Sequence, residues 1–409
     1  MTRIRLIFAA LALSAVTAAA QTSAPSGPWR VERARRGDTA VVRTLGGSTW
    51  SSIQLVEELR IGSKEGDGPE AFGALTGFAL FPNGTIAVFD PSIPALNLFD
   101  SSGKHLRTLG RSGSGPGEYR DQVTALAVDR NGVILMHDLR NARINRWQQD
   151  GSALPAWRWS SSMMLVSFKH GLLVDTTGHT YIPVIMERPE PGKDLKRGFV
   201  RLDPNGAVVD TVRRPAIAGP DEPPLVIFSP HKHWFLTRAG REVSGFSGAY
   251  AITLAGPGRG AVRIERVIPQ LALEPDERKN HQEITEARTT SGRMGSQPGP
   301  TPRVPAVKPF FSQLHSDLDG RLWVQLYGKG ERYDSPPPPK QPGMPELPPL
   351  RWRERMVWDL FEPDGTYLGQ LELPKLAQLA EAKGDRLWAI ERGEDGEQYI
   401  VRYRMSRGR

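Results

Sequence analysis

The chain has 409 residues, of which 39% are hydrophobic and 8% aromatic, an ordinary composition for a folded protein. Its formal net charge of +8 comes from basic residues interspersed with acidic ones, and no run of about five basic residues exists that would mark a nucleic-acid footprint. The absence of cysteine excludes disulfides, thiolate metal sites and lipid attachment at an N-terminal cysteine.

Residues 1–20 have the pattern of a cleavable secretory signal peptide. Arg3 and Arg5 precede an apolar run over 7–20 that ends in three alanines. This run is short and alanine-rich for a bilayer span, which needs about 20 residues, so cleavage after Ala20 is favoured over an uncleaved anchor. We therefore expect a periplasmic or secreted protein with no transmembrane segment after cleavage.

An extension over 21–52, expected to be partly flexible, leads into a sequence repeat that spans 53–407. The segments 82–110 and 130–158 match at a constant offset of 48 residues. The matching landmarks are Gly84 and Gly132, Asp90 and Asp138, Leu96 and Ile144, Phe99 and Trp147, and Gly103 and Gly151.

Each unit predicts an antiparallel sheet. The Asn-Gly pair predicts a tight turn with both central residues at positive φ, and the apolar run after it predicts a strand buried on both faces. Asp90 and Asp138 then follow at repeat spacing, where we expect their carboxylates to accept backbone N–H groups. Four antiparallel strands in about 45 residues describe one blade of a β-propeller.

Weaker copies extend to the C-terminus and make six units, the last without its fourth strand. The sequence LRIG at 59–62 repeats LRTLG at 106–110, which is the outer strand of the first complete unit. Because no three strands precede 59–62, we expect this strand to complete the last blade and close the ring. The fold class is therefore predicted as all-β, a six-bladed propeller closed by an N-terminal strand.

Two segments interrupt the repeat. The insertion 269–309 follows the fourth unit and contains a predicted helix that begins near Pro275, with acidic residues in its first turn. The segment 335–350 in the fifth unit is rich in proline and predicts an extended loop. We expect both to project from the same rim of the ring.

These motifs resemble a known repeat. GSGPGEY at 113–119, with Gly115 and Pro116, followed by VTALAVDRNGVILMHDLRNARINRW, is similar to the repeat of NHL-type propellers. The region 51–407 resembles exported bacterial six-bladed propellers related to NHL and TolB-like proteins. Among such relatives, lactonase-like enzymes hold Ca²⁺, amidating-lyase relatives hold Zn²⁺ with histidine, NHL domains bind RNA or protein, and TolB-like propellers act as scaffolds.

The loops that cross between blades supply most of the candidate binding residues. Glu70 and Phe72 in one loop, and Glu118, Tyr119 and Arg120 in the next, lie where successive blades meet. The alternative interpretation is that Phe72 and Tyr119 pack between blades.

Three further candidates come from the fifth unit. Phe310 and Phe311 are placed like the aromatic residues of the earlier crossing loops, and His315 precedes a turn from which it could face the central channel. We assign all of these residues to binding and none to catalysis.

The sequence indicates no complete set of metal ligands. His231 and His233 form an H-x-H that would place both rings on one face of a strand, but the sequence indicates no third ligand. The stretch GFSGA at 245–249 is not a nucleophile elbow, because its second glycine comes one residue early. We expect no cofactor; the alternative is one Ca²⁺ or Zn²⁺ ion in the channel.

The sequence thus predicts an exported, monomeric, non-catalytic binding or scaffold propeller. Its partner would be an envelope protein or a small ligand at the channel mouth and inter-blade loops. The alternative is a metal-dependent lactonase-like hydrolase, esterase or lyase with its site in the channel. RNA binding conflicts with the signal peptide, so no nucleic-acid partner is expected.

Overall fold

The structure, a computed structural model, describes residues 29–46, 53–64, 66–120, 123–159, 171–187, 196–220, 226–256, 259–290, 301–333, 346–393 and 395–407. The predicted signal peptide, residues 21–28 and 47–52 of the extension, and residues 335–345 of the Pro-rich segment lie outside these ranges.

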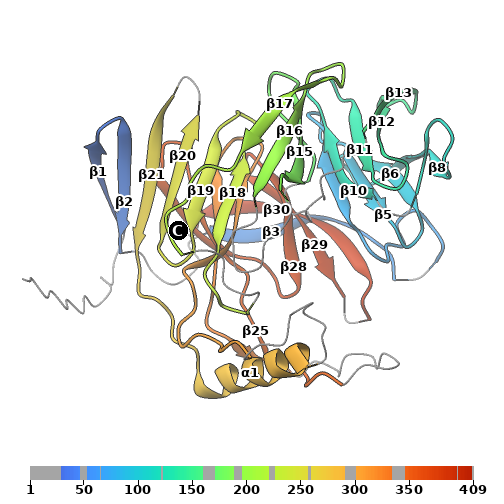
Figure 1. The fold of residues 1–409 in the computed structure, drawn as a ribbon. Coiled ribbons are helices and arrows are strands. Elements are labelled where there is room, and N and C mark those ends of the chain that lie inside the picture. The colour runs from blue at the N-terminus through green and yellow to red at the C-terminus, as the bar shows by residue number, and fades with distance from the viewer. Residues whose placement is uncertain are drawn as a thin grey trace, which may run out of the picture.

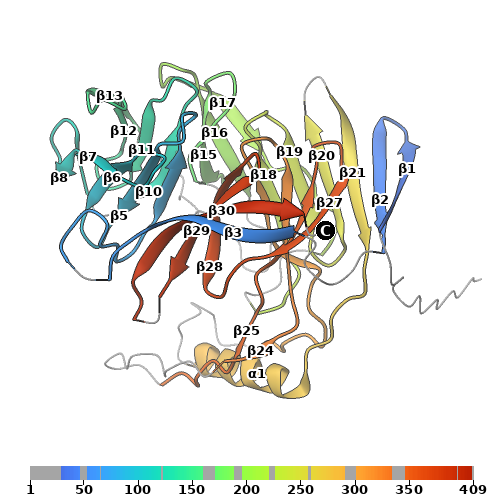
Figure 2. The same cartoon turned by 180° about the vertical axis from the view of Figure 1, so that it is seen from behind.

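Six sheets form the blades of a propeller, and in each of them four antiparallel strands follow one another from the central channel to the outside (Figures 1 and 2). Blade one contains β4 (Gly77–Leu80), β5 (Ile86–Asp90), β6 (Ala95–Phe99) and β7 (His105–Leu109). Blade two contains β10 (Val123–Val128), β11 (Ile134–Asp138), β12 (Arg143–Trp147) and β13 (Ala153–Arg158). Blade three contains β14 (Leu173–Val174), β15 (Thr180–Ile185), β16 (Arg197–Leu202) and β17 (Val208–Arg213).

The second half of the ring repeats this arrangement. Blade four contains β18 (Lys232–Leu236), β19 (Glu242–Phe246), β20 (Ala251–Gly256) and β21 (Arg259–Val267). Blade five contains β22 (Phe311–Ser316), β23 (Leu322–Leu326), β26 (Val357–Phe361) and β27 (Tyr367–Glu372). Blade six contains β28 (Ala377–Lys383), β29 (Arg386–Arg392), β30 (Gln398–Arg407) and, from the N-terminal side, β3 (Ile53–Ile61).

The hydrophobic core is divided into clusters that lie between neighbouring blades. One cluster joins blades one and two through Phe89, Tyr119 and Trp147, and another joins blades six and one through Trp388 and Phe99. The second strand of each of the first two blades is buried along its whole length, as the continuous apolar runs predicted. Packing between flat sheet faces therefore holds the blades in a ring.

The closing strand lies where the repeated LRIG phrase placed it. Strand β3 pairs antiparallel with β30, from Ile53 opposite Arg407 to Ile61 opposite Ile400. Both views show the blue β3 alongside the red β30 (Figures 1 and 2). Main-chain pairing between the two ends of the chain thus closes the ring.

The hairpin turns differ from the predicted two-residue type. In blades one to five, a five-residue turn joins the first two strands, and its fourth residue donates its N–H to the carbonyl of the first. That fourth residue is a glycine at positive φ in every case: Gly84, Gly132, Gly178, Gly240 and Gly320. Asn83 does not share the positive φ of Gly84, because this longer turn needs only one residue in the left-handed region.

The aspartates at repeat spacing have the structural role predicted for them. The Asp90 carboxylate accepts the N–H groups of Gly73 (2.7 Å) and Ser92 (2.8 Å), which ties the crossing loop to blade one. Asp138 accepts the N–H of Asn141 at 3.1 Å. Both side chains are buried, so these bonds satisfy carboxylates that would otherwise be costly to desolvate.

Part of the N-terminal extension forms a hairpin that the sequence did not predict. Strands β1 (Arg30–Arg36) and β2 (Thr39–Leu45) pair antiparallel, and β2 pairs parallel with β21, so blade four becomes a six-stranded sheet. Trp29 anchors the hairpin by packing its ring edge-on against Tyr367 of blade five. Two short pairs complete the strands: β8 (Arg111–Ser112) with β9 (Glu118–Tyr119), and β24 (Glu331–Arg332) with β25 (Trp352–Arg353).

Strand direction defines two rims of the ring. The innermost strands all end at the turns that lead into the second strands, so we call that side the hairpin rim. The opposite side, where each blade passes to the next, is the crossover rim. The helix α1 (Pro275–Thr290) begins at Pro275 as predicted and lies beyond the crossover rim with β25 (Figure 1). Within the described ranges, no helix is both long and apolar enough to cross a membrane.

A buried ionic cluster fastens this insertion. The ammonium group of Lys308 donates to Glu277 of α1 (2.7 Å), to Glu354 before β26 (2.7 Å) and to the Gly328 carbonyl (3.0 Å). Only 1% of the side-chain surface of Lys308 and of Glu277 is exposed. Three separate segments therefore meet at one cation whose three N–H donors are all used.

Candidate functional site

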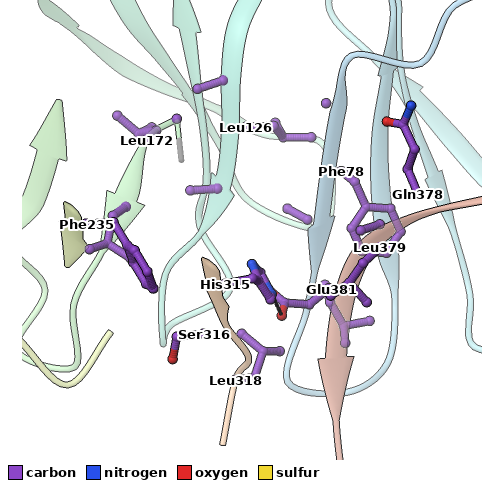
Figure 3. A pocket seen from close by; sticks show the side chains of 18 of the residues that line it. Phe78, Leu126, Leu172, Phe235, His315, Ser316, Leu318, Gln378, Leu379 and Glu381 are labelled. Carbon is purple, nitrogen blue, oxygen red and sulfur yellow. Dashed lines mark hydrogen bonds and ion pairs between the residues drawn. The ribbon is translucent and has the colours of Figure 1, made fainter. Parts of the chain in front are cut away.

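The central channel contains a cavity of about 880 Å³ lined by the innermost strands of all six blades. Its walls follow directly from the topology, because β4, β10, β14, β18, β22 and β28 are the first strands of their sheets and stand side by side around the axis. Figure 3 shows side chains from several of these strands pointing into the space. A cavity of this size is in the usual range for small-molecule sites.

The two halves of the wall differ in chemistry. Blades one to three contribute aliphatic and aromatic groups, and among their described side chains in the lining Thr76 is the one polar group. Blades four to six contribute apolar groups as well, among them Phe235, Met356, Trp358 and Leu379, together with most of the polar groups: Thr237, Arg238, Gln313, His315, Ser316, Gln325, Gln378 and Glu381. The channel is therefore amphipathic across its width.

The titratable residues of the lining are Arg238, His315 and Glu381, and all three lie toward the hairpin rim. Arg238 follows the end of β18, and the other two lie in the last residues of β22 and β28. His315 Nε2 lies 3.4 Å from Glu381 Oε1, and the two side chains are adjacent in Figure 3. Three consecutive blades thus bring their charged groups to one end of the channel.

Arg238 reaches from blade four toward blade two. Its Nη2 donates to the carbonyl of Val128 at 2.8 Å, and its own carbonyl accepts the N–H of Thr176 in blade three at 2.9 Å. Burial lowers the pKa of Arg238 below its ordinary value, while the carboxylates of Glu381 and Asp129 oppose this effect. The guanidinium is therefore held at a fixed place in a poorly solvated environment.

Of the residues predicted from the sequence, His315 lines the channel. Phe72, Tyr119 and Phe311 are buried in the clusters between blades, as the packing interpretation of the crossing loops required. Phe310 is half-buried and packs against the ring of Tyr250. The three buried aromatic rings therefore form no surface for a partner.

The polar residues of the crossing loops mainly stabilise those loops. Glu118 pairs with Arg111 (2.8 Å) and accepts the N–H of Gly115 (2.7 Å), which lowers its pKa. Arg120 donates to Ser114 within the same loop, at 3.1 Å. The backbone carbonyl of Glu70 accepts the N–H of Ser63. None of these side chains belongs to the channel lining.

Arg238 and Glu381 were missed by sequence reasoning. The available signal is positional: both lie within two residues of the inner hairpin turns of their blades, the same place that His315 has in blade five. A search for polar residues just before or after each inner turn would have found all three.

The described residues contain no group of three His, Cys, Asp or Glu side chains placed to hold a metal ion. The channel lining supplies one histidine and one glutamate, and His233 of the H-x-H pair instead packs its ring against Phe311 at 5.1 Å. The residues present thus do not match the donor set of a Ca²⁺ or Zn²⁺ site.

Comparisons with known proteins address the fold. No protein-family model and no curated protein matches the sequence. A member of the DUF4221 family from Bacteroides vulgatus is similar in structure, with a TM-score of 0.54 and 11% identity over 88% of this chain and 99% of that chain. A candidate exported protein from Bacteroides fragilis has a TM-score of 0.48 and 11% identity over 88% and 98% of the two chains.

A virginiamycin B lyase from Staphylococcus aureus is more distant, with a TM-score of 0.38 and 12% identity over 85% of this chain and 98% of that chain. Identities at this level bear on the fold alone, and the first of these similarities agrees with the arrangement of the blades.

Proposed function

We propose that the protein is a non-catalytic binding module, related to exported NHL-like and TolB-like propellers, that takes a small amphipathic molecule into its central channel outside the cytoplasm. The observation that supports this most directly is the division of the channel wall. One side is aliphatic and the other carries polar groups, so a ligand with an apolar body and a polar group would satisfy both. The N-terminal pattern over 1–20 supports export.

Binding in the channel is testable with a neutral apolar fluorophore, N-phenylnaphthylamine. We expect saturable binding with one site per chain. Leu172→Trp should weaken it, since Leu172 lies in the cavity wall and the larger ring occupies ligand space (Figure 3). A loss of about tenfold in affinity corresponds to about 1.4 kcal/mol, which is comparable with the roughly 1.5–3 kcal/mol that burial of one large apolar side chain contributes.

The matched control is Val208→Trp. Val208 lies on the outer strand of blade three and is 62% exposed, so the same substitution there should leave binding unchanged. Circular dichroism and melting show whether each variant is folded. Absence of saturable binding by the unchanged chain, or equal affinity for Leu172→Trp, would contradict the proposal.

A further inference from the structure

The channel contains an arginine, Arg238, that no described carboxylate contacts directly. Arg238 forms no salt bridge with any described residue: its Nη2 donates to the Val128 carbonyl, and the carboxylates of Glu381 and Asp129 act on it electrostatically without forming an ion pair. A guanidinium has five N–H donors, so the bond to Val128 uses only part of its hydrogen-bonding capacity. Burying a charge without a direct ion pair is costly, so an arginine that is held in place in a cavity wall and that no described carboxylate contacts is a candidate binding group.

The other two titratable groups of the lining are already engaged with each other or with the backbone. Glu381 Oε1 faces His315 Nε2 and also accepts the N–H of Ala382 at 2.9 Å. The Glu381 carboxylate therefore has partners of its own. Arg238, in contrast, has more N–H donors than there are acceptor groups bonded to it. A ligand that binds at this end of the channel would therefore need to supply a hydrogen-bond acceptor for Arg238.

We infer that the channel selects an anionic amphiphile, such as a carboxylate with an apolar chain or ring, whose anionic group binds Arg238 near the hairpin rim. The planar fork of a guanidinium matches the two oxygens of a carboxylate, and the interaction is strong where water is scarce. The apolar part would lie along blades one to three, on Leu126, Leu172 and neighbouring side chains. This inference rests on the proposed function and adds the charge of the ligand to it.

The test uses three compounds with the same alkyl chain and different head groups: decanoate, decanol and decylammonium. Each displaces N-phenylnaphthylamine from the full chain at neutral pH. We expect decanoate to bind most tightly. Arg238→Gln should weaken decanoate by about ten- to a hundredfold, the range for a charge-assisted hydrogen bond, and leave decanol almost unchanged.

Three further variants separate the role of the charge from that of the fold. Arg238→Lys keeps the cation and should keep the preference for decanoate, although with lower affinity because the fork is lost. Glu381→Gln removes a nearby negative charge and should strengthen decanoate binding several-fold. Arg111→Gln is the control, since Arg111 is 82% exposed and lies outside the channel.

The outcomes distinguish this inference from the proposed function. Equal affinity for the three head groups, a preference for decylammonium, or an Arg238→Gln variant that still prefers decanoate would overturn the anionic class while channel binding stands. Binding of the fluorophore with no displacement by any of the three compounds would also overturn it. If the fluorophore itself does not bind, both the proposed function and the inference fail.

Discussion

At the scale of single residues, the aromatic side chains of the crossing loops explain why the repeated phrase exists. Tyr119 packs edge-on against Trp147, with ring centroids 6.1 Å apart, and Phe72 packs in the same way against Phe99 at 5.8 Å. Phe99 and Trp147 are themselves equivalent positions of the repeat. Each of the two crossing loops therefore places one aromatic ring between neighbouring blades: Phe72 packs between blades six and one, and Tyr119 packs between blades one and two.

Tyr119 has a second role that Phe72 lacks, and this predicts the effect of a single-atom change. Its buried hydroxyl accepts the N–H of Leu96 at 3.0 Å and donates to the Leu109 carbonyl at 2.9 Å. Tyr119→Phe leaves both backbone groups buried without this partner, so the free energy of unfolding should fall by about 1–3 kcal/mol. Urea unfolding measures the change.

Tyr399→Phe is the matched control for that measurement. The Tyr399 hydroxyl donates to the Glu397 carboxylate at 3.3 Å, and this carboxylate also accepts the N–H of Asp395, so the change should cost less than about 0.5 kcal/mol. If the two variants lose equal stability, the bridging hydroxyl of Tyr119 is not what stabilises the end of the β6–β7 ladder.

At the scale of elements, local patterns predicted the blades but not their additions. The apolar runs, glycines and aspartates of blades one and two are local signals, and the strands lie where those signals indicated. The β1–β2 hairpin has no such signal. Its outer strand is almost entirely exposed, and its inner strand is held by parallel pairing with β21, more than two hundred residues away in the sequence.

Channel-facing residues were the least predictable part of the site. Adjacent residues of an innermost strand point to opposite faces, so a register error of one residue exchanges lining and core. Several of these strands carry apolar side chains on both faces, as in β10. His315 could be proposed because it is a histidine next to a predicted turn. Glu381 lies in a stretch where polar and apolar residues mix, and nothing in the sequence distinguishes it from a solvent-facing residue.

The Lys308 cluster predicts how the helical insertion responds to pH. Burial raises the pKa of Glu354 to about 7, with the neighbouring Glu277 adding to the rise and Lys308 opposing it. Because the folded pKa lies above the ordinary value of 4.5, this group's contribution to stability is fully present below about pH 4.5 and is lost as the pH rises through about 7. The loss should be on the order of 3 kcal/mol.

Glu354→Gln should remove this part of the pH dependence, since glutamine keeps a partner for Lys308 without titrating. Burial also lowers the pKa of the nearby His281, and this makes stability rise with pH, in the opposite direction. The comparison is therefore the difference in unfolding free energy between the unchanged chain and Glu354→Gln, measured by urea unfolding from about pH 4.5 to about 7. Lys308→Met should instead destabilise at neutral pH by about 3–5 kcal/mol, because the buried carboxylate of Glu277 loses its cation. Parallel pH profiles for the unchanged chain and Glu354→Gln would contradict the assignment.

At the scale of the whole molecule, stability depends on one seam. In blades one to five, the four strands of the propeller are near one another in sequence, and the β1–β2 hairpin only adds to the edge of blade four, whereas blade six needs β3 from the opposite end of the chain as its fourth strand. Opening that seam exposes the edge of β30 and frees both ends of the ring. Glu58 of β3 reinforces the seam by accepting hydrogen bonds from Arg404 of the neighbouring strand β30 (3.1 Å) and from Arg386 of β29, the next strand of the sheet (2.8 Å).

A disulfide across the seam tests how far closure controls unfolding. Gln54 and Ser406 are partners in the β3–β30 register, and a chain without cysteine makes Gln54→Cys with Ser406→Cys a single defined cross-link. The control pair, Arg201→Cys with Asp210→Cys, joins sequential strands of blade three and closes a short loop. The loop-entropy relation gives the seam cross-link an advantage of about 3 kcal/mol over the control.

The comparison is made between the oxidised and reduced forms of each double variant, so that the substitutions themselves cancel. A larger increase in unfolding free energy for the seam cross-link means that separation of β3 from β30 accompanies global unfolding. Equal increases would mean that the ring opens elsewhere first, and that the N-terminal strand is not the element on which the closed propeller depends.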